Sequence, residues 1–335
     1  MTEAANLRVW HEGRVGRLVL DRPRALNALD LGMISGLAEA LANWREAPAV
    51  QAVLITGAGE RAFCAGGDIR AMREAALAGD GVAIERFFAD EYALNEGIAN
   101  YPKPYIALID GICMGGGIGV SVHGAVRVAS EHARFAMPET GIGFFPDIGA
   151  SYFLPRLPGE IGMYLALTGA ELHGADAVHA GLATHFVPRA AFPDLERAII
   201  ADGPAVIAGF AAPLPPFGLA PHRALIDRCF GEASVPAIIA ALEAAATPFA
   251  AETLATLRAR SPSALAWSFA LLRRGAERTL SACLAQELAL TRRITRHPDF
   301  HEGVRAMVVD KDRTPRWRPA SLAEVDPAAI AALFT

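Results

Sequence analysis

The sequence predicts an α/β fold in which strand and helix units repeat, followed by a helical C-terminal region. Short apolar runs with the length of buried strands alternate with segments whose apolar residues recur at helical spacing. From about Ser261 to Arg296 the chain has helical character alone, and a polar, loop-like tail follows. We therefore predict a core over residues 1–188, which carries the active site, and a helical extension with the C-terminal region over 189–335.

The predicted strands lie in the N-terminal half. Residues 7–20 alternate in two short runs around Glu12 and Gly13, which is typical of a β-hairpin. A helix over residues 30–46 is expected to follow, with Asp30 as its N-cap. Further short apolar runs predict strands, and their residue ranges are 52–57, 104–110, 125–130, 133–139 and 182–188.

Helices are expected between these strands and after them. Residues 69–99 have helical spacing with a weak point at 78–81, and a helix opens at the glycine-rich segment 114–119. Two shorter helices are predicted over 157–170 and 174–181. The segment 189–260 is rich in alanine and proline, and its APLPPFGLAP stretch predicts an exposed connection between helices.

Composition limits the classes of function. A chain of 335 residues with 53% hydrophobic residues is long enough to bury a core, and a net charge of −5 gives no reason to expect a nucleic-acid or membrane partner. The only lysines are Lys103 and Lys311, so any contact to a phosphate would come from arginine. The cysteines lack metal-site spacing and the N-terminus lacks an apolar segment. We therefore expect reduced thiols, no metal, and a cytoplasmic location.

Two short motifs raise other enzyme classes. GAGERA at 57–62 matches the G-x-G-x-x-A dinucleotide pattern, but FCAGGD stands where the helix should follow, and no second strand ends in an acidic residue about twenty positions further on. GVSVH at 119–123 is one residue short of the G-x-S-x-G nucleophile elbow, and its Ser121 falls inside a predicted helix. Neither a nicotinamide enzyme nor a serine hydrolase is favoured.

Two carboxylates stand in an apolar segment, FAMPETGIGFFPDIG at 135–149, which contains Glu139 and Asp147. A carboxylate that loses water without a partner costs several kcal/mol or has its pKa raised. A sequence that keeps two of them among phenylalanines, prolines and glycines is expected to use them chemically.

Two glycine clusters follow predicted strands, CAGGD at 64–68 and MGGGIG at 114–119. Glycine lets the backbone approach a ligand closely, and two converging N–H groups stabilise a developing oxyanion. Either cluster alone is explained by a tight turn. Together with Glu139 and Asp147, the pair predicts an oxyanion hole.

Longer stretches carry a family resemblance. ERAFCAGGDIRAM, KPYIALIDGICMGGGIGVSVHG and FAMPETGIGFFPDIG resemble the crotonase superfamily, also called the enoyl-CoA hydratase/isomerase superfamily. LALTGAELHGADAVHAGLATHFV and the tail DFHEGVRAMVVDKDRTPRWRPASLAEV resemble its 3-hydroxyisobutyryl-CoA hydrolase branch. The likeness covers nearly the whole chain and is weakest over 189–260. It implies a crotonase-like ββα spiral core.

The resemblance also implies roles for the glycine clusters. The amides of Gly67 and Gly116 would hold the thioester oxygen of an acyl-CoA substrate. The loop with Ala65, Gly66 and Asp68 would face the adenine of coenzyme A. Basic residues near its phosphates match Arg24 and Arg70, and the acyl pocket is expected to include Phe87, Glu91 and Tyr92.

Residue 119 separates the reactions known in the superfamily. Hydratases carry a glutamate three residues after the central glycine of the second cluster, and this sequence has Gly119 there. Glu139 matches the other hydratase carboxylate, and Asp147 matches the aspartate of the hydrolase branch. The resemblance thus implies thioester hydrolysis. Glu139 would attack the carbonyl or act as general base, and Asp147 would orient the water or Glu139, or help to protonate the thiolate.

The implied substrate is 3-hydroxyisobutyryl-CoA, with 3-hydroxypropionyl-CoA as a second acyl group, in valine breakdown. A hydroxyl on the acyl chain needs a polar partner, for which Glu91 is the candidate. No metal or redox cofactor is expected, because coenzyme A is part of the substrate. Hydration or isomerisation of an enoyl-CoA and a non-catalytic acyl-CoA-binding role remain alternatives. Assembly as a homo-oligomer remains open.

Overall fold

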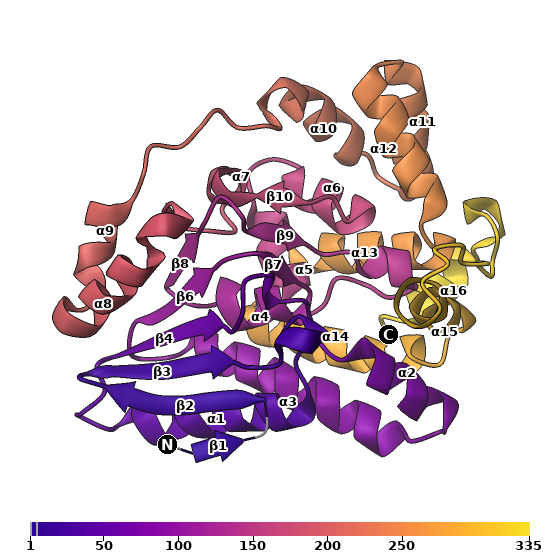
Figure 1. Cartoon of the computed structure of the whole chain (residues 1–335). Coiled ribbons are helices and arrows are strands. Elements are labelled where there is room, and N and C mark those ends of the chain that lie inside the picture. Colours follow the sequence, from indigo (N-terminus) through magenta and orange to yellow (C-terminus); the bar gives the residue numbers. More distant parts are fainter. Residues whose placement is uncertain (1, 5) are drawn as a thin grey trace. The chain divides into compact units, whose positions relative to one another are not determined.

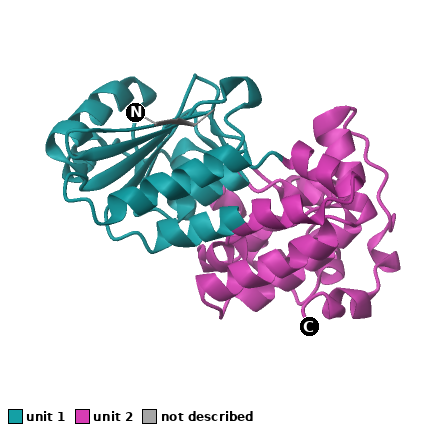
Figure 2. Ribbon diagram, turned by 90° about the horizontal axis from the view of Figure 1, so that it is seen from below, with its two compact units in different colours: residues 1–68, 90–135, 172–218 teal, residues 69–89, 136–171, 219–335 magenta. Residues whose placement is uncertain are grey.

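The computed structural model describes residues 2–4 and 6–335, which form two compact units (Figure 2). Unit 1 consists of residues 1–68, 90–135 and 172–218, and unit 2 of residues 69–89, 136–171 and 219–335. The units therefore alternate along the chain, whereas the division that we predicted at residue 188 is a single cut. That division stays a prediction from sequence character.

Unit 1 contains a seven-stranded sheet whose first strands are antiparallel and whose later strands are parallel (Figure 1). The predicted hairpin is confirmed, because β2 and β3 pair antiparallel around Gly13, whose φ is +56°. The strands lie in the order β1 (Thr2–Ala4), β2 (Leu7–Glu12), β3 (Val15–Leu20), β4 (Ala52–Gly57), β6 (Tyr105–Ile109), β8 (Val126–Ala129) and β11 (His185–Phe186).

The two faces of this sheet follow the period of two in its sequence. On one face, Val15 and Leu54 belong to an apolar cluster that includes Leu195 of α8 (Phe192–Asp202). On the other face, a Cβ on Gly16 would lie 2.5 Å from the Trp44 ring of α1 (Leu31–Arg45). Helix α1 begins as predicted, since the Asp30 carboxylate accepts a hydrogen bond from the Met33 amide at 2.8 Å.

A second sheet contains four short strands, and two of them lead into the glycine clusters. Its order is β10 (Leu172–His173), β9 (Arg134–Ala136), β7 (Ile112–Met114) and β5 (Ala62–Cys64). Neither β5 nor β7 is among the strands that we predicted, because strands of three residues are too short to show a period and depend on pairing with each other.

The helix predicted over residues 69–99 divides where expected. Helix α2 (Ile69–Leu77) ends before the Gly79 turn, and α3 (Gly81–Ala99) follows. In the second glycine cluster, α4 (Gly116–Val122) forms as predicted, and in unit 1 α7 (Gly174–Ala180) matches the prediction for 174–181. The APLPPFGLAP stretch is mostly exposed and carries only a short 3-10 turn at its end, as predicted, between α9 (Ile207–Phe210) and α10 (Arg223–Phe230).

Unit 2 is largely helical. Helix α6 (Ile161–Thr168) begins later than predicted, and the helix predicted over 261–296 is two helices, each started by its own hydroxyl cap, at Ser261 and Thr279. The remaining helices of the unit are α5 (Ala150–Phe153), α11 (Val235–Ala245), α12 (Pro248–Ala259), α13 (Pro262–Gly275), α14 (Leu280–Ile294), α15 (Pro298–Val304) and α16 (Pro327–Ala332).

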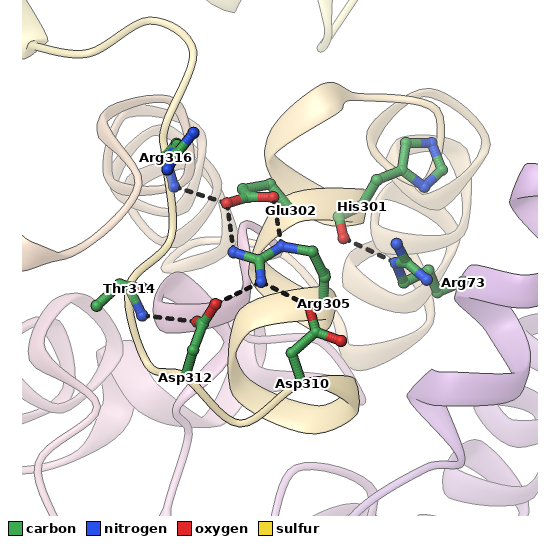
Figure 3. Close-up of polar contacts among 8 residues, drawn as sticks. All are labelled: Arg73, His301, Glu302, Arg305, Asp310, Asp312, Thr314 and Arg316. Carbon is green, nitrogen blue, oxygen red and sulfur yellow. Dashed lines mark hydrogen bonds and ion pairs between the residues drawn. The ribbon is translucent and has the colours of Figure 1, made fainter.

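One arginine contacts several acids at the start of the polar tail (Figure 3). The guanidinium of Arg305 contacts Glu302 at 2.8 Å, Asp310 at 2.7 Å and Asp312 at 2.6 Å. The backbone amide of Arg316 donates to the same Glu302 at 2.9 Å. The charged residues of the tail indicate a loop in the sequence, and in the structure the guanidinium of Arg305 holds several of them in place.

Within residues 2–4 and 6–335, no helix combines the length and the apolar character that a membrane crossing requires.

Candidate active site

The first glycine cluster is fixed to the segment 26–29 by backbone hydrogen bonds within unit 1. The Ala65 amide donates to Leu26 at 3.0 Å, and the Asp68 amide donates to Leu29 at 2.8 Å. Gly66 has φ +114°, a backbone conformation that only glycine adopts without strain. Among the backbone hydrogen bonds of the described residues, none uses the Gly67 amide as donor. The loop thus leaves that N–H available.

The second glycine cluster brings Gly116 against this loop. A Cβ on Gly116 would lie 3.1 Å from the Gly67 amide nitrogen and would collide with Oε1 of Glu91. Conversely, a Cβ on Gly66 would lie 3.7 Å from the Gly116 amide nitrogen. Only glycine permits an approach this close. Unit 1 therefore brings together Gly67, Gly116 and Glu91, three residues that we predicted to act on the substrate.

Glu91 is an acid on α3 that is only 2% exposed. Its charge also affects Cys64, whose pKa is raised to about 12, mainly by burial and in part by Glu91. A thiol with such a pKa is not a nucleophile near neutral pH. The four cysteines are free and buried, in agreement with the expected reduced thiols.

The predicted contacts to coenzyme A are divided between the units. Arg24 and Asp68 are in unit 1 and Arg70 is in unit 2. Arg24 is exposed in a short turn, while Asp68 pairs with Arg22 at 2.8 Å. Arg70 is also exposed, and its Nε lies 3.2 Å from Glu74 one helical turn away. Asp68 is thus engaged by an arginine that our sequence analysis did not name.

Of the predicted acyl-pocket residues, Phe87 belongs to unit 2, and Glu91 and Tyr92 belong to unit 1. All three are buried. Gly119, the position that separates hydratases from the hydrolase branch, is buried within α4, so no carboxylate stands at that place. The dismissed nucleophile Ser121 is also in this helix, where its hydroxyl donates to the carbonyls of its own preceding turn.

Glu139 and Asp147 lie in unit 2, in the segment that joins β9 to α5. Each is 6% exposed. Phe144 and Phe145 lie between them in the sequence, and the fully buried rings of these two residues stack with centroids 4.4 Å apart. A Cβ on Gly143, whose φ is +67°, would collide with the carbonyl of a residue in α15. The apolar setting predicted for both carboxylates is confirmed.

A third buried acid contacts the turn that follows Asp147. Glu287 of α14 accepts a hydrogen bond from the Gly149 amide at 2.7 Å. It also accepts from the amide and the hydroxyl of Ser151, at 3.0 and 2.5 Å. Burial raises the pKa of Glu287 to about 8, and the charge of Asp147 acts in the same direction, while the bonds from Ser151 and Gly149 oppose it.

Sequence analysis missed Glu287, although the sequence contains a signal. Within α14 the apolar spacing that predicts the buried face passes through this acid. The buried residues of the helix are Cys283, Leu284, Glu287, Leu290, Thr291 and Ile294. An acid on such a stripe requires buried partners, as the two carboxylates of the 135–149 segment do.

The chemistry available in the two units can be stated separately. Unit 1 offers two closely spaced backbone amides, a typical site for an oxygen that acquires negative charge. Unit 2 offers the buried carboxylates of Glu139 and Asp147, which can attack, or accept and return a proton.

Comparison with known proteins agrees with this chemistry. A family model described as Enoyl-CoA hydratase/isomerase matches residues 15–334. Three curated relatives are named 3-hydroxyisobutyryl-CoA hydrolase, mitochondrial. The one from Xenopus tropicalis is 47% identical over 96% of this chain and 87% of its own length. The one from Rattus norvegicus is 44% identical over 97% of this chain and 87% of its own length. The one from Homo sapiens is 44% identical over 94% of this chain and 84% of its own length.

Two solved structures are similar over almost the whole chain. A structure titled as a carnitinyl-CoA dehydratase from Mycobacterium thermoresistibile has a TM-score of 0.95 and 46% identity, and covers 99% of this chain and 96% of its own. One titled as an enoyl-CoA hydratase from Rhodobacter sphaeroides has a TM-score of 0.92 and 40% identity, over 99% and 97%. The predicted crotonase-like spiral with a helical C-terminal region is thereby confirmed, and the chain belongs to the enoyl-CoA hydratase/isomerase family.

Proposed function

We propose that this enzyme hydrolyses the thioester of 3-hydroxyisobutyryl-CoA to free coenzyme A and the 3-hydroxy acid, as a step of valine catabolism. The proposal depends mainly on two positions taken together. Gly119 stands where hydratases carry a carboxylate, and Asp147 is present and buried. The names of the curated relatives, which match over more than nine-tenths of this chain, support the same reaction. 3-Hydroxypropionyl-CoA is a second acyl group that we propose.

In the proposed mechanism the amides of Gly67 and Gly116 stabilise the charge that develops on the thioester oxygen. Glu139 either attacks the carbonyl carbon, which gives an acyl anhydride and releases the thiolate, or takes a proton from the attacking water. In the first case water then cleaves the anhydride and regenerates Glu139. Asp147 orients the water or Glu139, or helps to deliver the proton that the leaving thiolate needs.

We assign substrate contacts from the same family likeness. The loop with Ala65, Gly66 and Asp68 faces the adenine, and Arg24 and Arg70 serve the phosphates. Glu91 accepts a hydrogen bond from the acyl hydroxyl, for which its burial beside Gly116 is the structural support. Carboxylates, amides and water suffice for every step, so we propose that no metal or redox cofactor takes part.

Hydration of an enoyl-CoA is a second candidate, because the two similar solved structures carry hydratase or dehydratase titles. Addition of water across a double bond uses two carboxylates in the family, and Gly119 takes the place of one of them. Isomerisation needs only one carboxylate and therefore remains a third candidate. Asp147, with no evident task in either reaction, favours hydrolysis.

We propose a cytoplasmic location, which four free, buried cysteines support because such thiols persist in a reducing compartment. The curated relatives carry the word mitochondrial in their names, so cell fractionation is the test. A homo-oligomer is also proposed, and sedimentation of the purified protein measures it.

The deciding experiment follows the release of free coenzyme A with a thiol reagent. (S)-3-Hydroxyisobutyryl-CoA is compared with crotonyl-CoA and acetyl-CoA. We expect rapid release from the first substrate alone. If no thiol forms while crotonyl-CoA loses its conjugated absorbance, the enzyme is a hydratase and the hydrolase assignment is wrong.

A further inference from the structure

The turn that follows Asp147 has a strained backbone. Ile148 has φ +56°, and Gly149 has φ +83°. Isoleucine is β-branched, so a left-handed conformation strains its backbone and persists only where the surroundings determine it. Ile148 is also completely buried. The backbone that carries Asp147 is therefore set by whatever holds the next residues of the turn.

Glu287 is the side chain that holds them. Its Oε2 accepts from the Gly149 amide, and its Oε1 accepts from both the amide and the hydroxyl of Ser151. These amides begin the short helix α5, where backbone donors have no partner within the helix. One carboxylate thus satisfies two such donors on both sides of Ala150.

The turn is also fixed from α13. A Cβ on Gly275, the last residue of α13, would collide with the carbonyl of Ser151. The turn is therefore packed closely between α13 and α14 within unit 2. A strained segment with close packing and three hydrogen bonds to one acid has little freedom to adopt another conformation.

Retaining an acid at this place has an energetic cost. Glu287 is fully buried, so its carboxyl group has lost its contacts with water and depends on hydrogen bonds within the protein to offset that loss. The raised pKa of Glu287 has the charge of Asp147 among its causes, which is consistent with two carboxyl groups close enough to interact. A turn that needed only packing would not require this acid.

We propose that Glu287 is a positioning residue for the reaction: through Gly149 and Ser151 it fixes the strained turn that sets the orientation of the Asp147 carboxylate. Its kinetic consequence rests on the proposed function, in which Asp147 acts on the water, on Glu139 or on the leaving thiolate. The structural part of the proposal, that Glu287 fixes the turn, holds whatever reaction the enzyme catalyses.

The test compares Glu287→Gln with a matched control, Glu85→Gln. Glutamine keeps the shape but has one acceptor oxygen, so its NH2 group must face one of the donors of the turn. Glu85 of α3 pairs with Arg292 of α14 at 2.6 Å. The control therefore removes a carboxylate contact of the same helix without touching the turn.

The first readout is amide hydrogen exchange at Gly149 and Ser151, which needs no substrate. We expect Glu287→Gln to speed exchange of at least one of these amides by about tenfold, and Glu85→Gln to leave both unchanged. Unchanged exchange in Glu287→Gln would overturn the proposal whatever reaction the enzyme catalyses. A wild-type protein that releases no coenzyme A would instead refute the proposed function and leave this readout intact.

The second readout separates kcat from KM. We expect Glu287→Gln to lower kcat by about 10- to 100-fold with little change in KM, because a misplaced group costs rate rather than binding. In an Asp147→Asn background the same change should add little further loss, since Glu287 acts through Asp147. Full additivity of the two changes, or an effect on KM alone, would overturn the proposal.

Ser151→Ala is the test variant if Glu287→Gln does not fold. It removes the hydroxyl bond to Glu287 and leaves both amide bonds in place. We expect a smaller loss of kcat, about threefold to tenfold, that is again absent in the Asp147→Asn background. Wild-type kcat in Ser151→Ala together with unchanged exchange at Gly149 would count against Glu287 as a positioning residue.

Discussion

A Cβ atom on Gly116 would lie 3.1 Å from the amide nitrogen of Gly67, so the two glycine clusters approach each other as closely as the backbone allows. Gly116 therefore cannot carry a side chain without disturbing Glu91 and the space beside the Gly67 amide. This relationship, found within unit 1, gives the oxyanion-hole hypothesis its most direct test.

Gly116→Ala should lower kcat by about 10²- to 10³-fold, because the added methyl group displaces Glu91 and obstructs the amide pair. Steady-state release of coenzyme A measures the effect. Gly97→Ala on α3 is the control, since a Cβ there meets nothing within 4 Å. We expect that control to keep full activity and to gain about 0.5–1 kcal/mol of stability. Equal activity of the two variants would refute the assignment of Gly116.

Glu139→Gln should lower kcat by about 10²- to 10⁴-fold while the affinity for an acyl-CoA stays within a few-fold of wild type. A binding protein without catalysis would show no such split. Rate and affinity are measured separately, by thiol release and by calorimetry with a slowly reacting acyl-CoA.

In a single turnover in water labelled with ¹⁸O, label in the peptide that contains Glu139 identifies this residue as the nucleophile. A nucleophilic carboxylate forms an anhydride, and we expect its hydrolysis to leave label in the peptide that contains Glu139 when water attacks the glutamyl carbonyl. A general base leaves all of the label in the released acid. Mass spectrometry of the digested protein and of the product reads both.

We expect the contribution of Glu287 to the free energy of unfolding to fall as the pH rises from about 4.5 to about 8. Its pKa is about 8 in the folded protein and near 4.5 when unfolded, so the folded state binds the extra proton between these values. The contribution is complete below about pH 4.5 and is lost as the pH approaches 8, by on the order of 4 kcal/mol. Urea unfolding at pH 5, 6.5 and 8 should show a flatter dependence in Glu287→Gln. An identical slope in both proteins would contradict it.

Arg305→Ala should release the tail to proteases. Arg305 contacts three acids and lowers the pKa of both Glu302 and Asp312 through its hydrogen bonds (Figure 3). Trypsin should cut after Lys311 at an increased rate in this variant. Arg258→Ala, which removes an exposed pair with Glu243, should be cut at the wild-type rate. Similar cleavage of all three proteins would show that Arg305 does not anchor the tail.

Much of the fold is predictable from local signals. The Glu12-Gly13 hairpin, the Asp30 cap and the break near Gly79 each depend on a few adjacent residues, and each forms where predicted. The strands β5, β7 and β10 contain only two or three residues, so their hydrogen bonds come from segments remote in the chain. No pattern within such a strand can reveal them.

The candidate site shows the same division. The two glycine clusters and the apolar segment with Glu139 and Asp147 are unusual without any structure, and the family resemblance then assigns Gly67 and Gly116 within the clusters. Glu287 could be recognised only because it is an acid among the apolar residues that form the buried face of α14. Its partners Gly149 and Ser151 lie more than one hundred residues away in the sequence. The pairing of Arg22 with Asp68 is equally nonlocal.

The burial of the four cysteines has a consequence for an enzyme whose product is itself a thiol. Each proposed turnover would release free coenzyme A, and once an oxidant has converted it to its disulfide, an accessible protein thiolate attacks that disulfide to form a mixed disulfide and expel one coenzyme A thiolate. Cys64 has its pKa raised to about 12, burial raises the pKa of the other three as well, and all four side chains are enclosed. The folded enzyme is therefore protected from forming mixed disulfides with the oxidised form of the coenzyme that it releases.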